Sequence, residues 1–144
     1  MATSPNFGFP EPDNTSLVKD GAQAMRSLGD AIDAEFAGLT VNAQTGTTYT
    51  AVKADGLYSF CTMDNASANT YRIPTDATYN FPTGTTFLVY QKGAGITTIN
   101  AVTSGTTTIS SAGATAAAPV LARYKSAACI KIAANSWIVV GAIA

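Results

Sequence analysis

The chain has 144 residues, contains no histidine, and has 17 charged residues that sum to a net charge of −1. This length fits one compact domain, or one domain with an extension, and is too short for two full domains. The absence of imidazole excludes histidine-based catalytic triads, histidine-ligated zinc sites and histidine general bases.

The composition also argues against two classes of partner. The eight lysines and arginines are scattered, whereas nucleic acids require a concentrated basic surface. No apolar run reaches the length of about 18 residues that a membrane span needs, and the N-terminus lacks the charged and apolar regions of a signal peptide. We therefore expect no binding to nucleic acid, no membrane span and no export by a signal peptide.

The charges are distributed unevenly along the chain. Residues 1–40 contain six acidic and two basic residues, whereas residues 41–144 contain three acidic and six basic ones. A surface so poor in charge must be hydrated by hydroxyl groups or covered by other chains. This is a first indication of an obligate oligomer.

Residues 1–14 are predicted to form an extended docking arm. Residues 3–14 contain three prolines and one glycine, so we expect neither a helix nor a paired strand in them. The aromatic side chains would anchor the arm in a groove of a neighbouring protein, and stiff prolines reduce the entropy lost on docking. The predicted anchors are Phe7, Phe9, Pro10 and Pro12. A disordered terminus is the alternative interpretation.

Residues 15–39 have the pattern of an amphipathic helix that associates with copies of itself. Thr15 or Ser16 can cap its start, and Gly38 stops it. Apolar residues recur seven positions apart with another between them, as in a short coiled coil. The predicted trimer interface consists of Val18, Met25, Leu28, Ile32 and Leu39. The alternative is that this helix packs on the β domain of its own chain.

Residues 40–144 are predicted to form a small antiparallel β-sandwich or barrel, which makes the protein mainly β. Alanine (26) and threonine (21) dominate the chain and leucine occurs six times, which excludes a leucine-rich helical bundle. Turn signals such as Asp55-Gly56 and Ser104-Gly105 separate short β-prone runs. The predicted strands are 47–52, 57–64, 70–74, 86–92, 96–102, 106–110, part of 120–132, and 137–143.

The last two strands have the pattern of a hairpin around Asn135. In the second arm, Trp137 and Val139 share one face, while Ile138 and Val140 share the other. This arm is apolar on both faces. Such a strand belongs in the middle of a domain or at a subunit interface.

The chain offers little for catalysis or metal binding. Asp55 and Asp64 each precede a turn residue, where an aspartate normally bonds its own backbone, and neither a calcium loop nor a phosphate loop occurs. Cys61 and Cys129 lie in apolar runs without a histidine to activate them, which favours buried free thiols over a disulfide. We therefore expect no enzyme activity, no cofactor and no metal.

Aromatic residues are the remaining candidates for binding. Exposed on one face of a sheet, they could stack on sugar rings, which would make the β segment a carbohydrate-binding module. The stronger interpretation is that they fill the core of a domain that has few leucines. The residues proposed for glycan contact are Tyr58, Tyr71, Tyr90 and Trp137.

Two stretches carry a resemblance to known families. Pro5-Asn-Phe-Gly-Phe-Pro-Glu-Pro-Asp, followed by Thr15-Ser-Leu-Val-Lys-Asp-Gly-Ala-Gln-Ala-Met, resembles the leader of minor tail proteins in long-tailed phages of actinobacteria. Residues 42–143, with Phe81-Pro-Thr-Gly-Thr and a closing Ala-Asn-Ser-Trp-Ile-Val-Val-Gly, are similar to the β domains that end phage head fibres and tail fibres. Such domains are commonly trimeric. About three residues separate the two stretches, where many fibre proteins insert a stalk.

The resemblance implies a homotrimeric virion structural protein: a minor tail or baseplate-associated short fibre or decoration, attached by its N-terminus. Its partners would be other virion tail or capsid proteins and a host-surface glycan. Such a protein is assembled in the host cytoplasm without a signal peptide and resides in the virion. A head fibre or capsid decoration protein and a carbohydrate-binding adhesin module are the alternatives.

Overall fold

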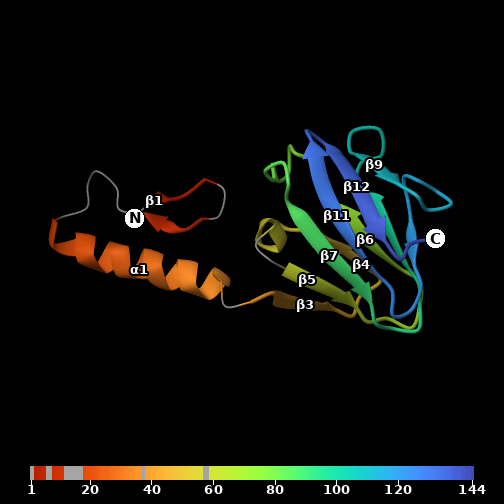
Figure 1. Ribbon diagram of the computed structural model, residues 1–144, viewed down its shortest axis with the longest axis horizontal. Coiled ribbons are helices and arrows are strands. Elements are labelled where there is room, and N and C mark those ends of the chain that lie inside the picture. Colours follow the sequence, from red (N-terminus) through yellow and green to blue (C-terminus); the bar gives the residue numbers. More distant parts are fainter. Residues whose placement is uncertain (1, 6–7, 12–17, 37, 57–58) are drawn as a thin grey trace. The chain divides into compact units, whose positions relative to one another are not determined.

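The computed structural model describes residues 2–5, 8–11, 18–36, 38–56 and 59–144. They form two compact units, residues 1–39 and residues 40–144. Figure 1 shows the first unit as a small hairpin with one helix, and the second as a stack of β-sheets. The protein is therefore mainly β, as the composition predicts.

The first unit begins with a small antiparallel hairpin of β1 (Ala2–Thr3) and β2 (Pro10–Glu11). The Ser4 amide donates to the Phe9 carbonyl and the Ser4 hydroxyl accepts from the Phe9 amide, both at 2.9 Å. The prediction that residues 3–14 contain no paired strand is therefore wrong. A proline is tolerated at the start of an edge strand, because no partner there requires its missing N–H, and Gly8 supplies a positive φ of 71° between the strands.

The helix α1 spans Val18–Phe36 and contacts β2. Asp20 lies in its first turn, where the helix dipole favours a negative charge. Gly38 follows its end with a φ of 137°, which a glycine adopts readily. Within the described residues, no helix is both long and apolar enough to cross a membrane.

The second unit consists of two sheets that face each other. In the described part of the chain, the larger sheet has the order β3 (Thr40–Gln44), β5 (Ser59–Met63), β7 (Thr86–Gln91), β11 (Ser126–Ala133), β12 (Ser136–Gly141) and β9 (Thr108–Ser111). The smaller has the order β10 (Val120–Leu121), β8 (Thr97–Ala101), β6 (Asn69–Ile73) and β4 (Thr48–Thr50). A 3₁₀ turn, η1 (Lys53–Gly56), follows β4. We call these the six-stranded and the four-stranded sheet.

The predicted antiparallel arrangement is wrong, because the sheets are mixed. From β3 to β9 the chain crosses to the other sheet after each strand and returns to each sheet in its original direction. The neighbours β3, β5 and β7 are therefore parallel, as are β4, β6 and β8. Antiparallel pairs remain at β7 with β11, β11 with β12, and β8 with β10.

Within residues 40–144 the predicted strand positions agree with the structure, with one omission. Each predicted run overlaps an observed strand, and the final hairpin turns at Asn135, whose φ is 48°. The strand β3 was not predicted. It lies at the edge of its sheet, and although its sequence Thr-Val-Asn-Ala-Gln alternates polar and apolar residues, the run is short and none of its residues is buried.

The core between the sheets is built largely from aromatic rings. Trp137 stacks on Phe87 with ring centroids 4.8 Å apart, and Phe81 meets the edge of Phe87 at 5.0 Å. Tyr71 closes the cluster from the four-stranded sheet at 6.3 Å from Phe87. These rings, with Val89 and other small apolar residues, supply the volume that leucine provides in other cores.

Candidate functional site

The outer face of the six-stranded sheet has no charged side chain among the strand residues that the structure describes. One row crosses five strands through residues that the register places side by side, Val41, Phe60, Leu88, Ala128 and Val140. The other side chains on this face are Ala43, Thr62, Thr86, Tyr90, Thr108, Ser110, Ser126, Ile130, Ser136 and Ile138. We call this surface the apolar face.

Several large side chains of the apolar face remain open to solvent in the single chain. Val41 is 63% exposed and Val140 48%. Phe60 and Tyr90 are half-buried and contact each other at 6.0 Å between ring centroids. The prediction that the last strand is apolar on both sides is confirmed, because Trp137 and Val139 lie in the core. The outward side of that strand still lacks a covering layer in the described residues.

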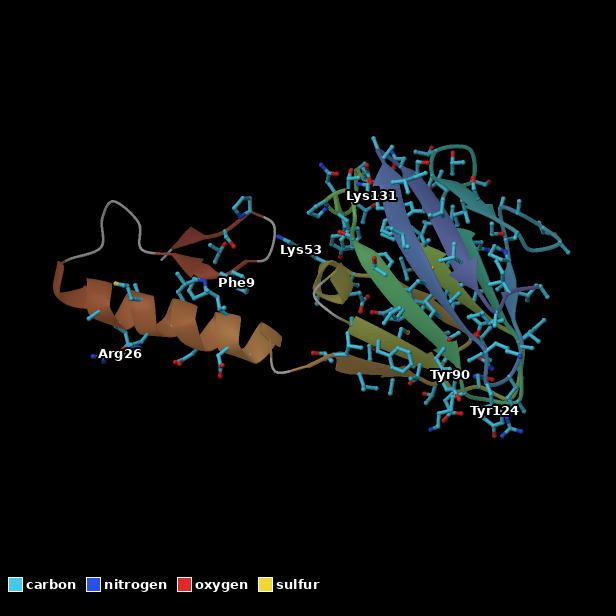
Figure 2. The ribbon with its side chains drawn as sticks, in the orientation of Figure 1. Phe9, Arg26, Lys53, Tyr90, Tyr124 and Lys131 are labelled. Atoms are coloured by element: carbon cyan, nitrogen blue, oxygen red, sulfur yellow. The ribbon has the colours of Figure 1, made fainter. Side chains whose placement is uncertain are left out.

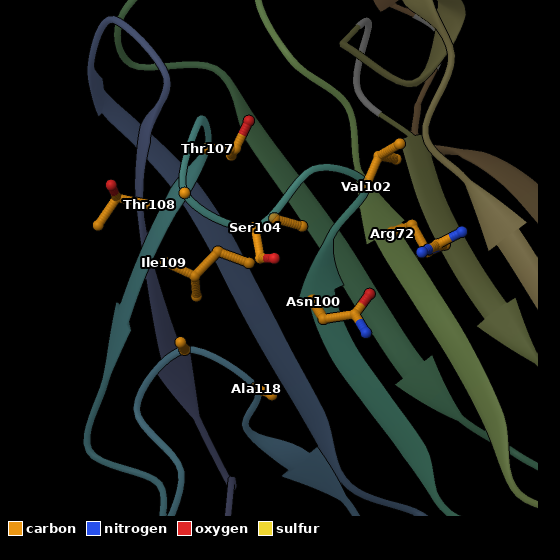
Figure 3. Close-up of a pocket in the computed structure, with 11 residues that line it drawn as sticks. Arg72, Asn100, Val102, Ser104, Thr107, Thr108, Ile109 and Ala118 are labelled. Atoms are coloured by element: carbon orange, nitrogen blue, oxygen red, sulfur yellow. The ribbon is translucent and has the colours of Figure 1, made fainter.

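The outer face of the four-stranded sheet has a different chemistry. The register places Thr48, Thr50, Thr70 and Thr98 on it, together with Arg72 and Asn100, which are neighbours on β6 and β8. Beside Arg72 and Asn100, a pocket of about 480 Å³ opens against the loop of residues 102–107 (Figure 3). The sandwich therefore has one outer face without charge, where apolar side chains lie among serines and threonines, and one that carries threonines, an amide and a guanidinium.

The predicted trimer-interface residues Met25, Leu28 and Ile32 share one face of α1 and differ in their exposure. Met25 is 73% exposed, and Ile32 is also exposed. Leu28 is half-covered and lies one turn from the buried Ala24, on the side that meets the hairpin. The side chain of Val18 lies outside the described residues. The inclusion of Leu39 in a helical row is wrong, because α1 ends at Phe36 before the positive φ of Gly38.

The predicted docking anchors are described only in part. Phe9 and Pro10 are half-buried in the hairpin, while Phe7 and Pro12 lie outside the described residues. Figure 2 shows Phe9 between the β1–β2 hairpin and α1. The arm is therefore not fully extended over residues 2–11, since its ends pair with each other.

Two of the four residues proposed for glycan contact are buried, so their assignment to a surface is wrong. Tyr71 is 0% and Trp137 1% exposed, because both point between the sheets. Tyr90 is half-buried on the apolar face, and Tyr58 lies outside the described residues. The interpretation of these aromatics as core residues is confirmed for Tyr71 and Trp137.

A buried ion pair ties the last hairpin to the loop after β6. Lys131 is 2% exposed, and its Nζ donates to Asp76 Oδ1 at 2.7 Å and to the Phe81 carbonyl at 2.6 Å. The second carboxylate oxygen of Asp76 accepts from the Asn135 amide at 2.9 Å. Asn135 Oδ1 in turn accepts from the Asp76 amide. These bonds hold the hairpin turn and give the pair a structural role.

The buried Asp55 also has a structural environment. Its carboxylate accepts from the Tyr49 hydroxyl at 2.7 Å, the Val52 amide at 2.8 Å and the Asn42 side chain at 2.9 Å. Burial, with this hydrogen bond to Asp55, raises the pKa of Tyr49 well above its usual range. The bond to Val52 is the local aspartate–backbone bond that the turn signal predicts. In the described residues, no group of three or more acidic or cysteine side chains could hold a metal.

Cys61 and Cys129 are buried free thiols, as predicted. Burial raises the pKa of Cys61 to about 12, and the nearby Asp55 carboxylate adds to it; burial also raises the pKa of Cys129 to about 12. Because the thiolate is the reactive form, both thiols should react with Ellman's reagent at pH 8 about a thousandfold more slowly in the folded protein than in denaturant. Fast reaction of either thiol in the folded protein would contradict this description.

Comparison with models of protein families, with curated proteins and with solved structures finds no match to this chain. The geometry of the two outer faces is therefore the basis for assigning a function. Sequence periodicity did not reveal the apolar face, since its rows join strands that are distant in the sequence. Arg72 was not singled out, because a lone arginine in a β-prone run has no distinctive pattern.

Proposed function

We propose that the chain is a virion structural protein: a homotrimeric short fibre or decoration of a phage tail or baseplate, attached by its N-terminus. The likeness of residues 5–39 and 42–143 to phage tail and fibre proteins supports this proposal. The observation that carries it is the apolar face, on which Val41 and Val140 are exposed in the single chain. A protein that functions only as a trimer would bury such a face against its own copies.

The size of the apolar face supports a larger interface than the sheet alone. Six strands about 4.8 Å apart and about 18 Å long cover about 500 Å² in projection. A stable interface takes about 800 Å² from each partner. Contacts outside the sheet would enlarge such an interface.

The exposed helix residues are candidates for this additional contact. Met25 and Ile32 are seven positions apart on α1 and exposed. This is the spacing that brings side chains to one seam of a coiled coil. A helix of 19 residues is marginal as an isolated coiled coil, so the helical seam and the apolar face would support each other.

The N-terminal unit would attach the trimer to the particle. Deleting residues 1–14 should abolish incorporation into virions and leave the oligomeric state unchanged, because the predicted contacts between copies lie after residue 14. Incorporation is measured by immunoblotting of purified particles, and the oligomeric state by light scattering. The control is Arg26→Ala, a substitution in α1 outside the deleted segment. Particles that contain the truncated protein at normal levels would contradict attachment through this segment.

A head fibre or capsid decoration protein would share these features and differ only in its place on the particle. Electron microscopy of particles labelled with an antibody against the β domain separates the two, since the label lies either on the tail or on the capsid. Label on neither would overturn the proposal of a virion protein. The adhesin alternative loses two of the four aromatic residues proposed for it, because Tyr71 and Trp137 are buried.

A further inference from the structure

The pocket on the four-stranded sheet is lined by both polar and apolar groups. Its volume of about 480 Å³ lies in the usual range for small-molecule sites, about 300–1,000 Å³. Figure 3 shows Arg72 and Asn100 on neighbouring strands, across the pocket from Ile109. The loop after β8 contributes Val102, Ser104 and Thr107. Thr108 and Ile109 of β9 also line it, so the pocket lies between the four-stranded sheet and the edge strand of the six-stranded sheet.

Among the residues that the structure describes, Arg72 has no counter-ion. In the described residues it makes no ion pair, whereas Lys131 pairs with Asp76 and Lys92 with Asp64. It is half-buried, and the register sets it beside Thr50 and Asn100, both uncharged. A guanidinium in this position is available to an anion from solution, and its planar fork matches a carboxylate through two parallel N–H···O bonds.

Two further polar atoms at the pocket have no partner. Asn100 Oδ1 and Thr107 Oγ1 are shielded from solvent and make no hydrogen bond in the described structure. Thr107 is 3% exposed, and both residues line the pocket. Buried polar atoms are nearly always hydrogen-bonded in folded proteins, so these two indicate a missing partner. A rotation of the Asn100 side chain that brings its oxygen to the pocket surface would allow a hydroxylated molecule to donate to it.

We propose that this pocket binds a small hydroxylated carboxylate of the uronic acid type. The carboxylate would pair with Arg72, a ring hydroxyl would donate to Asn100 Oδ1, and the carbon skeleton would lie against Val102 and Ile109. One guanidinium, with no lysine or second arginine in the lining, suits a single negative charge better than a phosphate. The proposal depends on these side chains alone and does not require the trimer or the place in a virion.

The test is a titration of the full-length ¹⁵N-labelled protein with sodium D-glucuronate, followed by NMR. Glucuronate should shift the signals of the Asn100 side chain and of residues 102–109, with a dissociation constant of about 1 mM, as expected for a ligand of this size. D-glucose, which has the same ring without the charge, should bind at least tenfold more weakly. Equal shifts with glucose, or shifts confined to other regions, would overturn the proposal.

Variants at the pocket make the test specific. Arg72→Met should weaken glucuronate binding at least tenfold, and Asn100→Asp should abolish it, because the new carboxylate pairs with Arg72 across the strands. Asn100→Asp changes no volume, so it remains informative if Arg72→Met folds poorly. Arg123→Met is the control, since Arg123 lies over the Tyr124 ring outside the pocket. Unchanged affinity in Asn100→Asp would contradict the assignment.

The acid could be a free molecule or one unit of a polysaccharide. Hyaluronan tetrasaccharide, which contains glucuronate within a chain, distinguishes these sources. Binding more than tenfold tighter than glucuronate at the same residues assigns the site to a polysaccharide. Binding equal to glucuronate or weaker assigns it to the free acid. Failure of both ligands to bind would overturn the proposal and would leave the oligomeric state and the place on a particle to their own tests.

Discussion

Replacing Leu88 by Asp should convert the proposed trimer of about 44 kDa into monomers of 14.7 kDa at micromolar concentration. Leu88 lies at the centre of the apolar face, between Phe60 and Ala128. A carboxylate buried there would have no counter-charge, which costs several kcal/mol for each copy, or about a hundredfold or more in the association constant. Size-exclusion chromatography with light scattering measures the change.

The matched control is Thr70→Asp, which places the same charge at the centre of the opposite outer face. It should leave the oligomer intact. Val140→Asp is a second disruptive variant at a position that is 48% exposed in the single chain, so folding should tolerate it. A monomeric wild-type protein would disprove the trimer. A wild-type trimer that persists in both variants would place its interface elsewhere.

Replacing Asp76 by Ala should lower the free energy of unfolding by about 3–5 kcal/mol, the cost of leaving one member of a buried ion pair alone. Lys131, at 2% side-chain exposure, would have only the neutral oxygens of Asn80 and Phe81 as partners. The Asn135 amide would also lose its acceptor at the hairpin turn. Chemical denaturation followed by the fluorescence of Trp137 measures the loss.

The control is Asp64→Ala, which breaks the ion pair between Asp64 and Lys92. The side chains of that pair are 40% and 59% exposed, so water screens it and the stability should change little. The double variant Asp76→Asn/Lys131→Met removes both charges at nearly constant volume. It should be more stable than Asp76→Ala. Equal losses from Asp76→Ala and Asp64→Ala would contradict the description of Lys131 as a buried, paired cation.

Local patterns predicted much of the secondary structure. The positions of the strands after residue 45 followed from turn residues and β-prone runs, and Asn135 adopts the positive φ that its hairpin turn requires. The helix followed from its apolar period, and its end from Gly38. In each case the determining residues are neighbours in the chain, so the sequence displays them directly.

The same signals did not distinguish a hairpin turn, which returns the chain beside the preceding strand, from a turn that carries the chain to the other sheet. A turn at Asp64-Asn65 can return the chain beside β5 or carry it to the opposite sheet, and the residues that favour it are the same. The chain takes the second course, and so parallel pairs replace the expected antiparallel ones. Pro10 can belong to a paired strand because it lies at the start of a two-residue edge strand, and no local sequence rule specifies that position.

The sequence by itself determined the low charge of residues 41–144, the positions of most strands and the two apolar sides of the last one. Only the tertiary structure decided which outer face collects the exposed apolar residues and which collects threonines, and only it set Arg72 beside Asn100. The reason is that a strand's own alternation assigns its side chains to two faces, while the packing of the two sheets against each other determines which face becomes core and which remains outside.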